Sequence, residues 1–392
     1  MEIYLDNSAT TRVYPEVAEL MKQIMLEDYG NPSSVHNKGF DAGNHVKLAR
    51  IRIAAALKAK EKEILFTSGG TESDNLALIG GAKANQRAGK HIITTKIEHP
   101  AVLKTFEYLE KEGFETDYLG VDELGRISLD ELKSKLRPDT ILVSVMHTNN
   151  EVGAVEPITE AGAIIKAFNP KILFHVDAVQ GFGKAEIIPS KAKIDLLSIS
   201  SHKIHGPKGV GALYVRDGVR LIPISYGGGQ QDGLRSGTLN TPGIAGMGLA
   251  AELVTKDLQS KRDKLVEIKN AFLKTVSEIP NVKVNGCERA ENGDFKVEET
   301  APHIINISVP GMRSEVMLHA LEEKGIYVSA GSACSSHSKK ESSTLKAMGA
   351  DAADMDGALR FSMSEATSME DMMTAASELK AVIEKFGRYV RG

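Results

Sequence analysis

Short runs of β-branched apolar residues alternate with segments of helical periodicity through the middle of this chain. Strands are expected at 64–67, 91–95, 141–146, 172–177, 194–200 and 209–215. Such alternation is typical of βαβ units, which build a largely parallel sheet with helices on its faces. We therefore predict an α/β fold in which functional side chains lie at the carboxyl ends of the strands.

The pattern changes in the last third of the chain, where shorter elements indicate a small α+β unit. A helical pattern runs from Thr241 to about Ile279, and strands at 303–309, 327–331 and 359–363 follow. A chain of 392 residues exceeds what one hydrophobic core usually organises. We assign residues 15–255 to a large domain, and residues 1–14 with 256–392 to a small one.

Charge and hydropathy exclude several classes of protein. The chain has 48 Lys and Arg against 52 Asp and Glu, without the basic excess that nucleic-acid binding requires. No apolar run approaches the roughly 20 residues of a membrane span, and the first residues lack the basic and apolar segments of a leader. We expect a cytoplasmic protein that binds neither nucleic acid nor membrane.

Only two cysteines occur, Cys287 and Cys334, and neither belongs to a C-x-x-C pair. This argues against a disulfide framework and against a structural zinc site. His202 and His205 could bind a metal by residue type, but no carboxylate or cysteine stands at a matching spacing. No metal site is expected.

The first candidate site residues lie where strand 64–67 turns into a helix. The segment Thr67-Ser-Gly-Gly-Thr-Glu-Ser73 presents backbone N–H groups and hydroxyls at a helix start, which suits a phosphate. An ordinary glycine turn with a hydroxyl cap is the alternative interpretation. Neither a Walker A loop nor a G-x-G-x-x-G motif after a strand is present, so nucleotide-binding classes lose their main support.

A lysine and a carboxylate end two neighbouring strands of the predicted sheet. Lys203 follows strand 194–200 with Ser200 and His202 beside it, and Asp177 ends strand 172–177, shortly before Gln180. Taken singly, Lys203 would be a solvated lysine and Asp177 a helix cap or a satisfied buried acid. Together with an anion site they are what pyridoxal 5'-phosphate (PLP) requires: an amine for its aldehyde and an acid for its pyridine nitrogen.

His99 follows strand 91–95 in Glu98-His-Pro100, at the same expected edge of the sheet. An imidazole there could stack on a planar cofactor or move protons near neutrality. A histidine before proline at a helix start is just as often a cap.

Taken in the order in which they occur along the chain, its motifs resemble those of cysteine desulfurases of the NifS/IscS-like family, a branch of the class-V aminotransferases. The resemblance rests on Tyr4-Leu-Asp-Asn-Ser-Ala-Thr-Thr11, Gly30-Asn-Pro-Ser-Ser34, the 67–75 and 98–100 segments, His147-Thr-Asn-Asn-Glu151, His175-Val-Asp-Ala-Val-Gln180, Ser201-His-Lys203 and Arg235-Ser-Gly-Thr238. It implies the aspartate-aminotransferase type of PLP-dependent transferase fold and a homodimer with active sites at its interface.

The resemblance also implies a role for each candidate residue. Lys203 would be the Schiff-base lysine, Asp177 the partner of the pyridine nitrogen, Gln180 that of the ring hydroxyl, and His99 would stack on the ring. The cofactor phosphate would be bound by Gly70, Thr71, Ser200 and His202, together with Thr238 from the other subunit. The carboxylate of L-cysteine would be bound by Asn150 and Arg360.

Cys334 separates sulfur chemistry from plain amino-group chemistry. It stands among small and polar residues, whereas a structural cysteine favours an apolar run. The resemblance implies that its thiolate, favoured by nearby cationic side chains at 337–340, attacks the substrate sulfur and becomes a persulfide while alanine is released. A protein acceptor such as an iron-sulfur scaffold would then take the sulfur. Cys287 looks like a turn cysteine without a role.

The long stretch between Cys334 and Gly349 resembles the long-loop group of the family. One departure concerns Ser364-Glu365-Ala366, where many relatives carry Gly-Arg-Phe, so that an acidic residue is expected beside the substrate carboxylate. The alternatives are a selenocysteine lyase or aminotransferase on the same fold, or a non-catalytic PLP-binding assembly subunit. Cys334 disfavours transamination, and the presence of both Cys334 and Arg360 disfavours the non-catalytic subunit.

Overall fold

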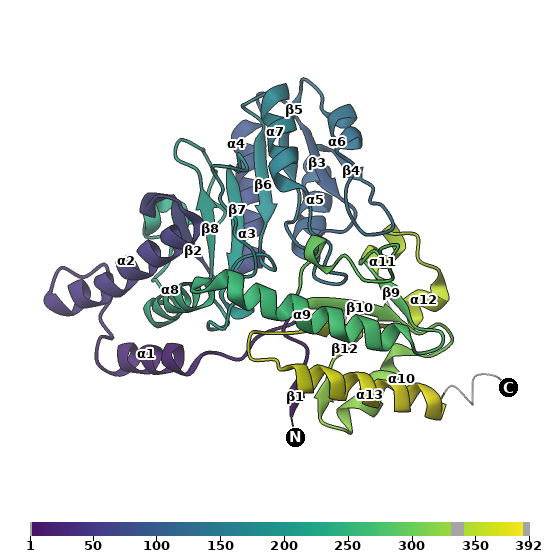
Figure 1. The fold of residues 1–392 in the computed structure, drawn as a ribbon. Helices are drawn as coiled ribbons and strands as arrows, with labels where there is room; N and C mark the ends of the chain where they lie inside the picture. Colours follow the sequence, from purple (N-terminus) through teal and green to yellow (C-terminus); the bar gives the residue numbers. More distant parts are fainter. Residues whose placement is uncertain (1, 331–340, 387–392) are drawn as a thin grey trace.

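The computed structural model describes residues 2–330 and 341–386, whose strands form one large and two small sheets (Figure 1). The large sheet has seven strands in the order β2-β8-β7-β6-β5-β3-β4. Its strands are β2 (Ile64–Thr67), β3 (His91–Thr95), β4 (Glu115–Leu119), β5 (Thr140–Ser144), β6 (Leu173–Asp177), β7 (Leu196–Ser200) and β8 (Gly211–Val215). Only β8 runs antiparallel to its neighbours, so the predicted α/β class with a mainly parallel sheet is confirmed.

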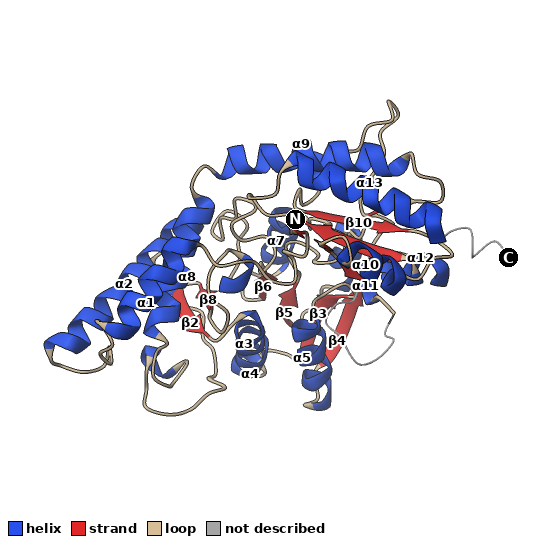
Figure 2. Ribbon diagram, turned by 90° about the horizontal axis from the view of Figure 1, so that it is seen from below, coloured by secondary structure: helices blue, strands red, loops and turns tan. Residues whose placement is uncertain are grey.

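Helices cover both faces of this sheet because its strands are apolar on both sides. Figure 2 shows α3 (Gly70–Asn75), α4 (Gly81–Asn85) and α5 (Pro100–Lys111) on one face and α7 (Ile158–Phe168) on the other. Successive strand residues alternate between the two cores: Ile92 packs with Phe106 of α5, and Ile93 packs with Ile165 of α7. Strands buried on both faces read as continuous apolar runs, which is why most of them were predictable.

Strand β4 was not predicted, because it is not buried on both faces and does not read as an apolar run. Its sequence, Glu-Thr-Asp-Tyr-Leu, contains no apolar run, because it lies at the edge of the sheet and only Leu119 is buried. Its pairing with β3 is parallel and places Leu119 beside Thr95.

The second sheet belongs to the C-terminal part of the chain. It is antiparallel in the order β12-β13-β10-β9. Its strands are β9 (Lys283–Asn285), β10 (Ile304–Ser308), β12 (Ser329–Ala330) and β13 (Ala358–Ser362), and β1 (Ile3–Tyr4) pairs in parallel with β11 (Ile326–Tyr327) nearby. The helices of this part are α9 (Leu258–Ser277), α10 (Ser314–Glu322), α11 (Ser343–Ala347), α12 (Ala352–Asp356) and α13 (Met369–Phe386).

A separate hydrophobic core holds this C-terminal part together. It joins Ile3 and Leu5 of the N-terminal segment to Phe272 of α9 and Phe361 of β13, whose rings lie 5.0 Å apart between centroids. The helices α1 (Pro15–Leu26) and α2 (Asn37–Leu57) contribute to the core of the large sheet instead. The cores are consistent with the assignment of residues 15–255 and of 1–14 with 256–392, whose boundaries stay a prediction.

The helical pattern after Thr241 was expected to be continuous, and this expectation was wrong. Two residues separate helix α8 (Thr241–Thr255) from α9, and Asp257 between them has a φ of 53°. Neither glycine nor proline marks the break. Packing decides it, since α8 lies against α2 of the large core and α9 against α13 of the C-terminal core.

In the described ranges, no helix combines the length and apolar character that crossing a bilayer requires.

Glu156 is a buried carboxyl group between the large sheet and the edge segment at 121–127. Its Oε2 accepts a hydrogen bond from the Ile127 N–H at 3.0 Å, and Oε1 has no hydrogen-bond partner among the described residues. Burial raises the pKa of Glu156 to about 8, and Asp122 adds to the effect. The folded chain therefore holds a proton that the unfolded chain releases near the ordinary value.

The stability that this bound proton contributes is complete below the unfolded-state pKa and is lost as the pH rises through about 8. We expect the free energy of unfolding of wild type to fall by about 1 kcal/mol or more over this window, since one pKa unit corresponds to about 1.4 kcal/mol. Glu156→Gln should remove that part of the fall. Denaturant unfolding of both proteins at acidic and mildly alkaline pH checks it, and parallel pH profiles would contradict the assignment.

Candidate active site

Lys203 lies at the carboxyl edge of the large sheet, where β7 ends and a short turn (Ser201–Lys203) follows. Its Nζ donates hydrogen bonds to the carbonyl oxygens of Ser8 and Ala9, the latter at 2.8 Å. Thr11 fastens the same N-terminal segment to the turn, because its N–H and Oγ1 both donate to the His202 carbonyl, at 2.9 and 3.0 Å. The lysine is therefore held at a strand end, as predicted.

Asp177 ends the neighbouring strand β6, which pairs in parallel with β7. The side chain is buried, and its Oδ1 accepts a hydrogen bond from the Val179 N–H at 2.9 Å. Burial raises the pKa of Asp177, while the positive charges of His99 and Lys203 oppose the rise. The structure thus brings together the acid, the imidazole and the amine that the sequence placed at separate strand ends.

Two further buried carboxyl groups lie near Asp177, and the sequence analysis assigned no role to either. Asp74 of α3 lies 3.6 Å from His175 Nε2. Glu98 accepts hydrogen bonds at Oε1 from Thr95 Oγ1 and the Met146 N–H, and its Oε2 has no partner in the described part of the chain. Burial raises the pKa of both groups well above the ordinary range, and the negative charge of Asp177 raises it further.

With Asp74 and Glu98 favouring the protonated form, Asp177 is the group of this cluster whose charge a neighbouring cation would stabilise. A protonated pyridine nitrogen beside Asp177 is such a cation, so this part of the site fits PLP. Asp74 and Glu98 both stand in motifs that the sequence showed, Ser-Asp-Asn75 and Glu98-His-Pro100. Only the tertiary structure shows that their carboxyl groups are buried.

His99 is a helix cap, as one interpretation of the sequence held, and its role at a cofactor stays a prediction. It caps α5, since its Nδ1 accepts a hydrogen bond from the Ala101 N–H at 3.1 Å. It also faces the site: desolvation lowers its pKa, Asp177 opposes this, and Lys203 adds to it. With Nδ1 as an acceptor, a neutral ring carries its proton on Nε2, where it remains available for donation.

The proposed phosphate cradle forms where two strand ends meet at Gly211. This glycine of β8 pairs with Thr67 of β2 and with Ser200 of β7. A Cβ atom at position 211 would lie 2.6 Å from the carbonyl carbon of Gly69, and one at Gly70 would lie 2.8 Å from Val179 Cγ2. The glycines therefore allow the start of α3 to approach the Ser200 turn, as a small anion site requires.

Other members of the predicted cradle lie around this point. His202 Nδ1 is 3.3 Å from Thr10 Oγ1, and burial, with Lys203 and Lys208 nearby, lowers its pKa to about 4. Thr71 is exposed at the start of α3. Gln180 is buried and donates from Nε2 to the Ser8 carbonyl at 3.0 Å.

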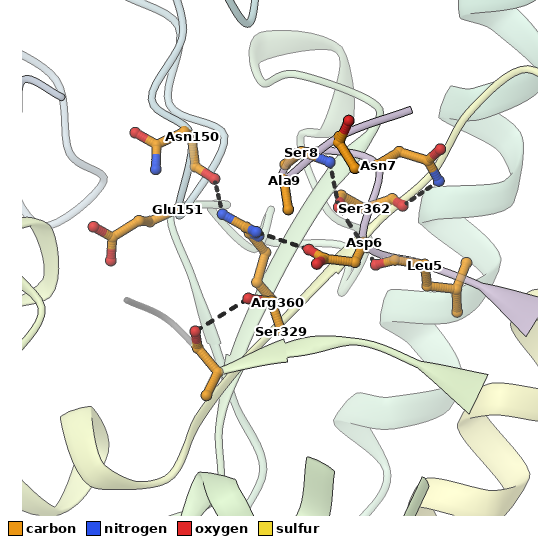
Figure 3. Close-up of polar contacts among 12 residues, drawn as sticks. Leu5, Asp6, Asn7, Ser8, Ala9, Asn150, Glu151, Ser329, Arg360 and Ser362 are labelled. Carbon is orange, nitrogen blue, oxygen red and sulfur yellow. Dashed lines mark hydrogen bonds and ion pairs between the residues drawn. The ribbon is translucent and has the colours of Figure 1, made fainter. Parts of the chain in front are cut away.

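Arg360 lies on β13 and contacts the N-terminal segment and Asn150 (Figure 3). Its Nη2 donates to Asp6 Oδ1 and its Nη1 to the Asn150 carbonyl, both at 2.9 Å. Asn150 thus contacts Arg360 through its backbone, which the sequence analysis did not anticipate. The guanidinium is buried, and its Nε has no hydrogen-bond partner among residues 2–330 and 341–386. A bidentate carboxylate is the ligand that such a group favours.

Ser362 strengthens this connection. Its Oγ accepts from the Ser8 N–H at 2.8 Å, and its carbonyl accepts from Asn7 Nδ2 at 2.9 Å. Residues 6–9 therefore join the strand that carries Arg360 to the turn that carries Lys203.

Glu365 was expected beside the substrate carboxylate, where it would disfavour binding. In the structure its carboxylate accepts a hydrogen bond from the Tyr14 hydroxyl at 2.5 Å and pairs with Lys261 at 2.8 Å. These partners lower its pKa against the effect of burial. Because the charge of Glu365 is compensated there, this acidic residue opposes the binding of cysteine less than the sequence suggested.

The described residues of one chain do not test the roles predicted for Thr238 and Cys334. Thr238 is exposed in the loop before α8, and the role assigned to it needs a second subunit. Cys334 lies outside the described residues. The first described range ends at Ala330, and Ser329 pairs with Arg360 across β12 and β13. In the described part, no three His, Cys, Asp or Glu residues form a potential metal site.

Known proteins have similar sequences and similar folds. The family model for class-V aminotransferases matches residues 3–374. "Cysteine desulfurase IscS" of Methanosarcina thermophila is 43% identical over 385 residues, which is 98% of this chain and 92% of the relative. A solved "NIFS-LIKE PROTEIN" superposes with a TM-score of 0.90 at 36% identity, over 98% of this chain and 100% of the other. "SspA in complex with cysteine" has a TM-score of 0.79 at 36% identity, over 92% and 98%.

Proposed function

This chain belongs to the class-V aminotransferase family, among its IscS/NifS-like cysteine desulfurases, and we propose that it moves sulfur from L-cysteine onto Cys334. The overall step balances: L-cysteine and the Cys334 thiol give L-alanine and the Cys334 persulfide. The observation that carries the proposal is that Lys203 and Arg360 both bind one N-terminal segment, residues 6–9, while Asp177 ends the strand next to the one that Lys203 follows.

The family uses PLP, and the fold is the α/β PLP-dependent transferase type expected from the sequence. When bound, PLP withdraws electrons from the substrate Cα and so makes its proton acidic. Lys203 would hold the cofactor aldehyde, Asp177 its ring nitrogen and Gln180 its ring hydroxyl, with His99 against the ring. Gly70, Thr71, Ser200 and His202 would hold its phosphate, together with Thr238 of a second subunit.

The chain's own groups divide the remaining work between binding and proton transfer. Arg360 and Asn150 would bind the substrate carboxylate, which orients the Cα proton toward the Lys203 amine. Lys203 would remove that proton, and His99 would donate from Nε2 to the carbon that loses sulfur. The Cys334 thiolate would attack the substrate sulfur, so that an S–S bond forms as the C–S bond breaks.

Cys334→Ser should abolish both products, with Cys287→Ser as the matched control. Wild type supplied with L-cysteine and a thiol reductant is expected to release equal amounts of alanine and sulfide. Cys287 is buried and burial raises the pKa of its thiol, so its replacement should leave turnover within about twofold of wild type. Amino-acid analysis and a sulfide assay check both products.

Turnover of Cys334→Ser at the wild-type rate would show that Cys334 is not the sulfur acceptor. A lyase that acts on selenocysteine, or an aminotransferase on the same fold, would then explain the site better. A wild-type protein that binds PLP but releases neither product would favour a non-catalytic assembly subunit.

We further propose a cytoplasmic homodimer that passes its sulfur to a protein acceptor such as an iron-sulfur scaffold. Large apolar side chains are exposed around α1 and the start of α2: Met25, Leu26, Tyr29, Val35 and Phe40. Such a group of exposed apolar residues is typical of a protein interface. A second copy on this face would agree with the role given to Thr238.

A further inference from the structure

A cavity of about 240 Å³ lies apart from the candidate active site. It is lined by residues 147–148, by Val155, by the turn at 184–186, by Gln259 and Arg262 of α9, and by residues 298–299 and 301–303. None of the residues assigned to the cofactor or the substrate lines it. The proposed function therefore does not account for this cavity.

His303 points to a missing ligand in this cavity. The side chain is 3% exposed, and both ring nitrogens lack a hydrogen-bond partner within the described chain. A neutral imidazole has one N–H donor and one acceptor, and leaving buried polar atoms unpaired costs about 1–3 kcal/mol each. Native proteins rarely leave both atoms of one group in this state, unless a water or a ligand satisfies them.

The charges around His303 are positive. Besides burial, the groups that lower its pKa are Lys184, Lys269, Arg262 and His147, and no carboxylate opposes them. Lys184 and Arg262 also line the cavity. The pKa of Lys184 is lowered to about 8 by burial and by the charge of Lys261, against the opposing charge of Glu365, so an anion in the cavity would further favour its charged form.

The carboxylates on the lining are mostly engaged elsewhere. Glu186 pairs with Lys58 at 2.7 Å, and Glu299 lies 3.5 Å from Arg126. Arg262 donates from Nη2 to the backbone carbonyl of Glu298 at 3.0 Å. This bond holds the guanidinium at the cavity and leaves its other N–H groups to donate to a ligand. The arrangement therefore favours an anion over a cation.

We propose that this cavity is a second anion site, which binds a small oxyanion bearing a phosphate or sulfate group. Its volume is below the roughly 300 Å³ at which pockets for drug-sized ligands begin. Arg262 would bind two oxygen atoms through its planar fork, Lys184 would supply a point charge, and the His303 N–H would donate to a third oxygen. The anion could be free in solution or part of a small phosphomonoester.

Calorimetric titration of the PLP-loaded protein tests the proposal, because the cofactor then fills its own phosphate site. Inorganic phosphate, sulfate and glycerol 3-phosphate are titrated separately at constant ionic strength set with chloride. Arg262→Gln and His303→Asn remove cavity donors. Lys380→Gln, which removes an exposed charge on α13, is the matched control. Cofactor absorbance before and after titration confirms that PLP stays bound.

We expect wild type and Lys380→Gln to bind one anion per chain. Arg262→Gln and His303→Asn should bind it at least about tenfold more weakly, because each loses one charged hydrogen bond worth about 1.4 kcal/mol. Tighter binding of glycerol 3-phosphate than of phosphate would identify a phosphomonoester as the ligand class, and the reverse order a free oxyanion.

Two results would overturn the proposal. The first is the lack of saturable binding by wild type. The second is equal affinity of Arg262→Gln and Lys380→Gln, which would place the anion elsewhere, for example at Arg360. If His303→Asn fails to fold, as thermal unfolding would show, Arg262→Gln at the half-buried rim decides alone.

Discussion

Lys203→Ala is expected to lower alanine and sulfide release by about 10³-fold or more, because in the proposed reaction one amine both holds the cofactor and moves the Cα proton. Its position is what makes it irreplaceable: Nζ lies at the end of β7, against the carbonyls of Ser8 and Ala9, where a water molecule could not take over both roles. The variant should also lose the absorbance band of lysine-bound PLP. Steady-state assays and absorbance spectra of purified protein measure the two effects.

Lys208→Ala is the matched control for this variant. Lys208 lies in the same turn region and its charge acts on His202, but its side chain is exposed. Its removal should change turnover by less than about twofold and should keep the absorbance band, as is usual for surface substitutions. Turnover by Lys203→Ala at a rate close to that of Lys208→Ala would contradict the role assigned to Lys203.

Asp177→Asn is expected to lower kcat by about 10²- to 10³-fold, the loss seen when one preorganised charge-stabilising group is removed. Asparagine keeps the shape of the side chain and can still accept the Val179 N–H bond, so the sheet edge should be preserved. What is lost is the negative charge that, in the proposed function, would keep the ring nitrogen protonated. Pre-steady-state and steady-state kinetics, with PLP content measured in parallel, separate a catalytic defect from loss of the cofactor.

Asp74→Asn removes a second buried carboxyl group from the same region. Asp74 lies on α3 rather than at a strand end, and burial and Asp177 already raise its pKa well above the ordinary range. A neutral amide therefore resembles its existing state, and we expect kcat within about threefold of wild type. An equal loss in both variants would indicate that the charge of the whole acidic cluster, and not Asp177 itself, supports the reaction.

Most of the large sheet was predictable from its apolar runs, because strands buried on both faces consist largely of apolar residues. Strand β4 escaped detection since an edge strand needs to bury only Leu119. The break between α8 and α9 escaped as well, because Asp257 adopts its positive φ under the constraint of two different packing surfaces rather than through its own preference.

The candidate site was predictable residue by residue, but the contacts between its residues were not. Lys203, Asp177 and His99 follow strands, and the carboxyl ends of parallel strands meet at one edge of a sheet. Nothing in the sequence indicated that Asn150 meets Arg360 through its carbonyl, or that Glu365 is neutralised by Tyr14 and Lys261. Such contacts join residues more than 90 positions apart, and local patterns carry no information on them.

The sequence by itself determined the α/β class, the residue types at each strand end, and the resemblance to cysteine desulfurases, because hydrophobic periodicity and motif chemistry are local properties. Tertiary structure alone decided which polar groups lose their water. That is why the acidic cluster around Asp177 and the cationic cavity at His303 could be recognised only in the folded chain. The energy of a charged or polar group depends on its burial and its neighbours, and both arise from packing between distant segments.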